Sequence, residues 1–135
     1  MPRWRAVLLG AALLAGAGLV GTSGGIHLSL WIASYYRFVP VIGPLFLFQS
    51  VTAFAVAVVL LLSRRFVAVM AAAGFLVATI GGYLLTVYVG LFGFRDTLAA
   101  QLGRTSLIVE AVGVAVLVLA GALIPARDRW HLPWR

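Results

Sequence analysis

Four apolar runs, separated by short connectors that carry arginine, constrain this chain more than any other feature. A helix needs about 20 consecutive apolar residues to cross the hydrocarbon core of a bilayer. The chain has 135 residues, of which 64% are hydrophobic and 10% are charged, so four such helices use almost all of it. The sequence therefore predicts an all-α, polytopic integral membrane protein. It forms a single four-helix transmembrane bundle over residues 1–135, without room for a soluble catalytic domain.

Prolines and glycines delimit the predicted spans. Pro44 suits the first turn of the second span, where its missing N–H costs nothing. Pro125 is expected to end the fourth span. The first run could instead be a signal peptide with residues 21–25 as the cleavage region, but apolar sequence resumes after these glycines. The predicted spans cover residues 5–28, 42–62, 66–90 and 105–124.

Two further patterns concern packing and the connectors. Apolar residues that recur at helical spacing predict a short amphipathic helix in the first outer connector. Trp31, Tyr35 and Tyr36 are then expected in the aromatic belt at the membrane interface. In the second outer connector, Asp96 is a candidate N-cap, either of a second interfacial helix or of an exposed start of the fourth span. Small residues every fourth position predict close helix packing. They are Ala17, Gly21 and Gly25 in the first span and Gly74, Ala78 and Gly82 in the third.

The distribution of arginine predicts the orientation in the membrane. An excess of arginine in short loops marks the cytoplasmic side. The side with more arginines is the one that holds both termini, so cytoplasmic termini are predicted. The use of arginine without lysine in an Ala/Gly/Val-rich chain indicates a GC-rich bacterium and its plasma membrane. The side with the termini holds Arg3, Arg5, Arg64, Arg65, Arg127, Arg129 and Arg135, and the other side holds Arg37, Arg95 and Arg104.

Several function classes have no support in the residues. The net charge of +7 lacks the basic stripe with interleaved aromatics that binds nucleic acid. Cysteine is absent, which excludes disulfides and thiolate metal sites. His27 and His131 are expected on opposite membrane faces, so neither a metal site nor a bis-histidine haem is predicted, although a haem or quinone cofactor stays an alternative. No catalytic motif is present, so the chain is predicted to be a non-enzyme.

Polar residues within the spans gather at one depth. With a helix rise of about 1.5 Å per residue, they lie roughly 21–27 Å from the side that holds most of the arginines, and His27 lies just beyond. Glu110 is the only acidic residue inside a span. An isolated carboxyl group there takes up a proton or finds a hydrogen-bond donor, or else it serves as hydrogen-bonded glue between helices. The candidate ligand-binding or proton-binding residues are His27, Gln49, Tyr83 and Glu110, of which the other three are the expected donors to Glu110.

Three arginines are predicted on the outer surface: Arg37, Arg95 and Arg104. They are candidates for binding anionic lipid headgroups, and Arg95 or Arg104 could instead pair with Asp96. Solvated interface charges are the simpler alternative.

In size and layout the chain resembles four-helix DoxX-type membrane proteins of high-GC bacteria, a likeness of architecture that carries no motif and implies little about activity. Small multidrug-resistance transporters also combine four spans with a membrane carboxylate, but theirs lies in the first helix, and this first span has none.

The function predicted from these patterns is a binding or accessory subunit with an outward-facing polar pocket for a lipid, a quinone or a partner. Its small-residue faces would pack it into a homo-oligomer or a larger membrane complex. Membrane lipids are the other expected partners. The alternative is a small proton-coupled transporter that uses Glu110 with His27. An enzyme or redox protein using His27 and Tyr83 is the weaker third hypothesis.

Overall fold

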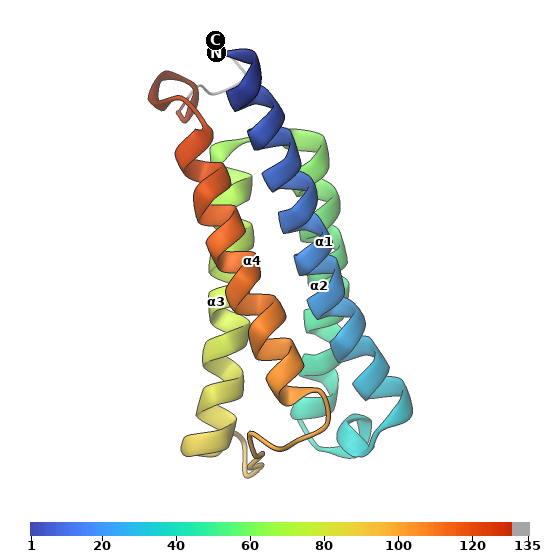
Figure 1. Cartoon of the computed structure of the whole chain (residues 1–135). Helices are drawn as coiled ribbons and strands as arrows, with labels where there is room; N and C mark the ends of the chain where they lie inside the picture. The colour runs from blue at the N-terminus through green and yellow to red at the C-terminus, as the bar shows by residue number, and fades with distance from the viewer. Residues whose placement is uncertain (131–135) are drawn as a thin grey trace.

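The computed structural model describes residues 1–130 as a bundle of four antiparallel helices (Figure 1). All four are long and apolar enough to cross a membrane, which confirms the prediction of an all-helical, multi-pass membrane protein. One-turn 3-10 helices, η1 (Tyr35–Phe38) and η2 (Ala126–Asp128), follow the first and the last long helix. The long helices are α1 (Arg3–Ala33), α2 (Ile42–Ser63), α3 (Phe66–Tyr88) and α4 (Gly103–Leu123).

The helices form a four-cornered bundle with one loose side. α1 packs closely against α2 and α4, and α4 against α3, whereas α2 and α3 are the loosest neighbouring pair. α1 begins and α4 ends at the end of the bundle that carries the α2–α3 loop (Figure 1). We refer to this as the arginine-rich end, and to the opposite end, with the α1–α2 and α3–α4 connectors, as the connector end.

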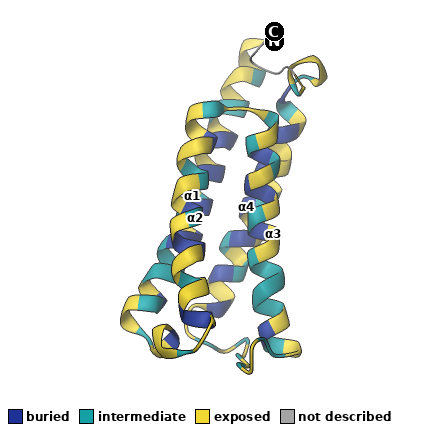
Figure 2. Cartoon of the chain, turned by 180° about the vertical axis from the view of Figure 1, so that it is seen from behind, coloured by how far each residue is buried: buried dark blue, intermediate teal, exposed yellow. Residues whose placement is uncertain are grey.

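An apolar core fills the middle of the bundle and its arginine-rich half. Its buried side chains come from all four helices. Figure 2 colours buried residues dark blue, and they occur along each helix. Glycine brings the backbones together at two levels. A Cβ on Gly113 would lie 2.5 Å from Leu76 Cδ1, and a Cβ on Gly24 would lie 2.8 Å from Ala53 Cβ. At Gly24 the Ser50 carbonyl oxygen is also only 3.2 Å away, so any larger residue would force the helices apart, whereas at Gly113 the end of the Leu76 side chain would have to move.

The predicted small-residue ladders are displaced from these close contacts. Ala17 is buried in the core, but a Cβ on Gly21, Gly25, Gly74 or Gly82 would have no neighbouring atom within 4 Å. The buried face of α1 instead passes through Gly16, Val20, Ser23 and Gly24. Since each residue advances an α-helix by about a hundred degrees, Gly21 and Gly25 turn away from the other helices.

The connectors differ from the predicted short helices. α1 continues to Ala33, because no glycine or proline interrupts residues 26–33, so most of the predicted interfacial helix belongs to it. Only η1 forms a separate short helix there. In the α3–α4 connector, Gly90 and Gly93 adopt positive φ angles of 90° and 75°, and Leu91 pairs with Phe94 in turns instead of a helix. Asp96 therefore caps no helix, and α4 begins at Gly103 after Leu102 at its N-cap position.

The helix ends otherwise follow the expected chemistry. Pro44 lies in the first turn of α2, and α4 ends at Leu123, just before Pro125, as predicted. At the arginine-rich end, Arg5 Nε donates a hydrogen bond to the Leu123 carbonyl oxygen at 3.0 Å. This bond satisfies a carbonyl that the last turn of a helix leaves without an intrahelical partner. It ties the start of α1 to the end of α4. His131 and Arg135 lie outside the described residues.

Candidate functional site

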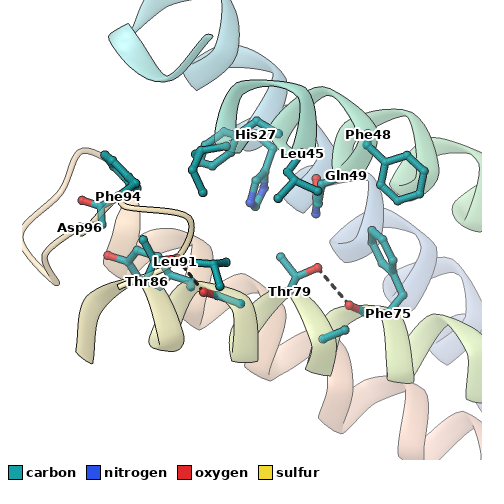
Figure 3. Close-up of a pocket in the computed structure, with 15 residues that line it drawn as sticks. His27, Leu45, Phe48, Gln49, Phe75, Thr79, Thr86, Leu91, Phe94 and Asp96 are labelled. Atoms are coloured by element: carbon teal, nitrogen blue, oxygen red, sulfur yellow. Dashed lines mark hydrogen bonds between the residues drawn. The ribbon is translucent and has the colours of Figure 1, made fainter. Parts of the chain in front are cut away.

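A cleft of about 370 Å³ lies between α2 and α3 in the connector-end half of the bundle (Figure 3). It occupies the side of the bundle where helix packing is loosest. Exposed side chains from the spanning segments, Leu45 and Phe48 on α2 and Ala78 on α3, belong to its lining. The cleft therefore opens through the side of the bundle, at the level of the membrane-spanning helices.

The walls of the cleft are mostly apolar and aromatic. α2 and α3 supply most of the lining, His27 enters from α1, and the α3–α4 connector closes the end with Leu91, Phe94 and Asp96. The polar lining residues are His27, Gln49, Thr79, Tyr83, Thr86 and Asp96. The aromatic lining residues are Phe46, Phe48, Phe75, Tyr83 and Phe94.

A buried polar cluster lies behind the cleft, where α1, α2 and α4 meet. Ser23 Oγ and Ser106 Oγ each donate a hydrogen bond of 2.8 Å to Glu110 Oε1. Gln49 Nε2 donates to Ser23 Oγ at 2.9 Å, while Gln49 Oε1 is buried without a hydrogen-bond partner. The cluster joins three helices through one carboxyl group, whose residue is 1% exposed.

A smaller cavity of about 30 Å³ connects the cleft region to this carboxyl group. It shares His27, Thr79 and Tyr83 with the cleft and also touches Ser106 and Glu110. Its volume can hold a single water molecule, which needs at least about 10–15 Å³. Among the described residues, Glu110 forms no ion pair and Oε2 accepts no hydrogen bond.

His27 contacts the cleft from the inner side. Its Nδ1 lies 2.9 Å from the Ser23 carbonyl oxygen, and its ring packs against Phe46 with centroids 5.0 Å apart. A carbonyl oxygen only accepts, so Nδ1 carries the hydrogen, and in the neutral imidazole Nε2 then has a lone pair. The expected direct bond from His27 to Glu110 does not form, since the described donors to that carboxyl are the two serines.

Tyr83 was also expected to donate to Glu110, and the structure places its hydroxyl elsewhere. Tyr83 OH donates to the Thr97 carbonyl oxygen at 2.7 Å, across to the α3–α4 connector. A Cβ on Gly103 would overlap this hydroxyl, so the glycine at the start of α4 makes room for it. Tyr83 therefore holds the connector over the cleft.

The connector end is closed by an aromatic stack with one polar contact. Tyr36 stacks on Phe46 and Tyr35 with centroids 4.7 Å apart in both pairs. Its hydroxyl donates to Asp96 Oδ2 at 2.7 Å, linking the two connectors. Burial, with the hydrogen bond and charge of Asp96, raises the pKa of Tyr36 far above its ordinary value. Tyr36 is only 3% exposed, so its prediction as a belt residue was wrong.

The three predicted headgroup arginines are exposed, but two of them bind backbone carbonyl groups. Arg95 donates to Val87 and Tyr88 at the end of α3, and Arg37 donates to the Ile32 carbonyl oxygen. Arg104 lies exposed in the first turn of α4. Within residues 1–130 no arginine forms an ion pair with Asp96.

Sequence reasoning located the depth of the site better than its contacts. The structure joins Gln49 to Glu110 through Ser23, a direct donor that the sequence did not single out from its neighbour Thr22. Ser106 is four residues before Glu110, a spacing that places both on one helix face. The aromatic lining gave no signal, because phenylalanine within a span is equally typical of a lipid-facing surface.

Residues 1–130 contain no group of three or more His, Cys, Asp or Glu side chains that could hold a metal ion. Comparison with protein-family models, with curated proteins and with solved structures finds no match to this chain.

Proposed function

We propose that this chain is a membrane-embedded binding or accessory subunit. Its α2–α3 cleft holds a molecule dissolved in the bilayer, such as a lipid or a quinone. The cleft carries the proposal. Its volume of about 370 Å³ falls within the range of ligand pockets. Its mouth lies between two spanning helices, so a ligand can enter from the bilayer without crossing the connectors.

The composition of the cleft supports an amphiphilic ligand. Apolar and aromatic walls suit a hydrocarbon body, and the polar groups near His27 and Gln49 suit one polar end. Phe48 at the mouth is 66% exposed, which leaves it free to pack against a bound molecule. The polar cluster bonds mainly to itself, through Ser23 and Ser106 on Glu110, and is buried behind the cleft, which supports binding over catalysis.

Two glycines of α3 offer a matched test. Gly82 lines the cleft and Gly74 does not, yet a Cβ at either position meets no atom within 4 Å. Gly82→Leu places a leucine side chain in the cleft from a Cβ position that is free of contacts, and Gly74→Leu makes the same change outside it. Native mass spectrometry of gently extracted protein is expected to detect an added small-molecule mass on the unmodified chain and on Gly74→Leu, and a loss of most of it on Gly82→Leu. An unmodified chain without any bound molecule, or equal retention by both variants, would contradict the proposal.

Proton-coupled transport is a second candidate, and the unpaired Glu110 favours it. A carboxylate within a membrane span is costly without a cation, and none pairs with it among the described residues. The small cavity places this group next to the cleft. Glu110→Gln keeps a side-chain oxygen that can accept the two serine hydrogen bonds, but it cannot take up a proton. In vesicles with a pH gradient, this variant is expected to abolish proton-coupled transport. A flux that Glu110→Gln leaves unchanged would exclude this mechanism.

We also propose that both termini are cytoplasmic in a bacterial plasma membrane and that the chain associates with copies of itself or with other subunits. The arginines of the arginine-rich end support the orientation. The chain has no cysteine, so single-cysteine variants report topology without background. Ala126→Cys, exposed at the arginine-rich end, is expected to resist an impermeant thiol reagent added outside intact cells, while Ala99→Cys, exposed in the α3–α4 connector, reacts. The reverse labelling would overturn the orientation.

A further inference from the structure

Hydroxyl groups along the cleft have already used their hydrogen atoms. Thr79 donates to the Phe75 carbonyl oxygen at 3.0 Å, as Figure 3 shows. Thr86 donates to Gly82 at 2.8 Å, and Tyr83 to Thr97 at 2.7 Å. A hydroxyl group has one hydrogen and two lone pairs. These three side chains can therefore offer a ligand only hydrogen-bond acceptors.

His27 adds a fourth acceptor. Its Nδ1–H is held by the Ser23 carbonyl oxygen, so Nε2 carries the free lone pair. Figure 3 shows the His27 ring directed between α2 and α3 into the cleft. Nε2 has no hydrogen-bond partner within residues 1–130, and His27 forms no ion pair there. An imidazolium here would lack a counterion among the described residues, so the site favours the neutral ring, whose Nε2 is open to a donor.

Gln49, beside His27 on the same wall of the cleft, also has an acceptor without a partner in the described part of the chain. It is 9% exposed, lines the cleft, and has a buried Oε1 without a hydrogen-bond partner among the described residues. Its Nε2 donates one hydrogen to Ser23, and the second N–H is the remaining side-chain donor of the described lining. Acceptors thus outnumber donors around the cleft.

The charge of the lining has the same preference. Asp96 contributes a carboxyl group, and no arginine is among the lining residues. Arg37 and Arg95 bind backbone carbonyl groups on the surface. Arg104, whose charge reaches Tyr83, is exposed and is not a lining residue. An anionic headgroup would enter this cleft without a counterion, which costs free energy in a low dielectric.

We propose that the cleft selects a lipid-soluble molecule with an aromatic or apolar body and a hydrogen-bond-donating, non-anionic polar end, with His27 Nε2 as the acceptor. A phenol fits this description, and an ether or a carboxylate does not. Of the quinones named above as ligands, the reduced form, a quinol, is the one that carries the required hydroxyl donor. The four lining phenylalanines suit an aromatic ring next to the hydroxyl group. This inference rests on the proposed ligand-binding function and specifies the chemistry of its ligand.

Nonylphenol and its methyl ether form a matched probe pair, since the ether keeps the body and removes the donor. Each is titrated at the same lipid mole fraction against the protein in nanodiscs, with bound probe counted by native mass spectrometry. The phenol is expected to bind roughly tenfold more tightly, the value of one hydrogen bond of about 1.4 kcal/mol. Nonylbenzenesulfonate is expected to bind more weakly than the ether. Nonylbenzylamine distinguishes the two kinds of donor, because tighter binding of this ammonium than of the phenol would overturn the assignment to a hydroxyl group.

His27→Phe keeps a ring in place and removes the acceptor. It is expected to lower the affinity for the phenol about three- to tenfold and to leave the affinity for the ether unchanged, which also shows that the cleft is intact. Ser29→Ala, on an exposed α1 hydroxyl bonded to Ile26, is the control and should change neither. Equal binding of phenol and ether by the unmodified chain would overturn the inference and leave the proposed function standing. Binding of neither would overturn the proposed function itself.

Discussion

Ser23 is the residue whose replacement tests the buried polar cluster most directly. Its hydroxyl accepts a hydrogen bond from Gln49 at 2.9 Å and donates one to Glu110 at 2.8 Å, and the residue is 0% exposed. Ser23→Ala removes one oxygen atom and leaves the shape of α1 nearly unchanged. Both bonds are lost at once, and Gln49 is then left without a described side-chain partner on either amide atom.

The expected cost follows from these contacts. Hydrogen bonds between membrane helices contribute about 0.6 kcal/mol each on average, so two bonds contribute about 1.2 kcal/mol. A buried polar group left without a partner costs a further 1–3 kcal/mol or so. We expect Ser23→Ala to lower the free energy of unfolding by about 2–4 kcal/mol, most of it from the stranded Gln49 amide.

The neighbouring Thr22 supplies the control. Its side chain is exposed and its hydroxyl donates to the Gly18 carbonyl oxygen of its own helix. Thr22→Ala removes a hydroxyl and an exposed methyl group from the same turn of α1 and should change stability by no more than about 0.5 kcal/mol. Both variants are compared by reversible denaturation in mixed detergent micelles, followed by circular dichroism.

A double-mutant cycle separates the bond from other effects of the substitution. Ser23→Ala and Gln49→Leu should be coupled by at least about 0.5 kcal/mol, because Gln49→Leu removes the amide that Ser23→Ala strands. If the two alanine variants were equally stable, or if the cycle showed no coupling, the three-helix polar cluster would be refuted.

Further outcomes follow from glycine packing and from Tyr36. Gly24→Ala is expected to cost about 1–3 kcal/mol in thermal unfolding, because its Cβ would lie 2.8 Å from Ala53 Cβ, whereas Gly21→Ala, with nothing within 4 Å, should be neutral or stabilising. Gly21→Leu should leave the bundle folded but dissociate an oligomer that packs through this face, and unchanged mass by light scattering would exclude such an interface. The Tyr36 phenol has a raised pKa, so its stabilisation is complete below the unfolded value of about 10 and declines as pH rises above it. The stability difference between the unmodified chain and Tyr36→Phe should therefore shrink in denaturation curves above about pH 10, and a constant difference would contradict the buried contact with Asp96.

Composition and chain length were enough to predict the architecture. Four apolar runs need four spans, because backbone polar groups within lipid must bond internally and a helix does this within each segment. Pro44 and Pro125 marked their helix boundaries for local steric reasons, independent of the neighbours. The depth of Gln49 and Glu110 also followed from local geometry, since helix rise alone fixes how far each lies from an end.

The tertiary structure decided how each helix is rotated about its axis. In a soluble protein the polar face indicates that rotation, but these helices are apolar on all sides, so van der Waals fit decides it. That fit buried Gly24 in place of Gly21, gave Glu110 two serine donors in place of His27 and Tyr83, and left α2 and α3 loosely packed. The sequence alone determined that four helices span a membrane and at what depth their polar groups lie. Only the packing of side chains between helices determined which of these groups meet and where a cleft remains.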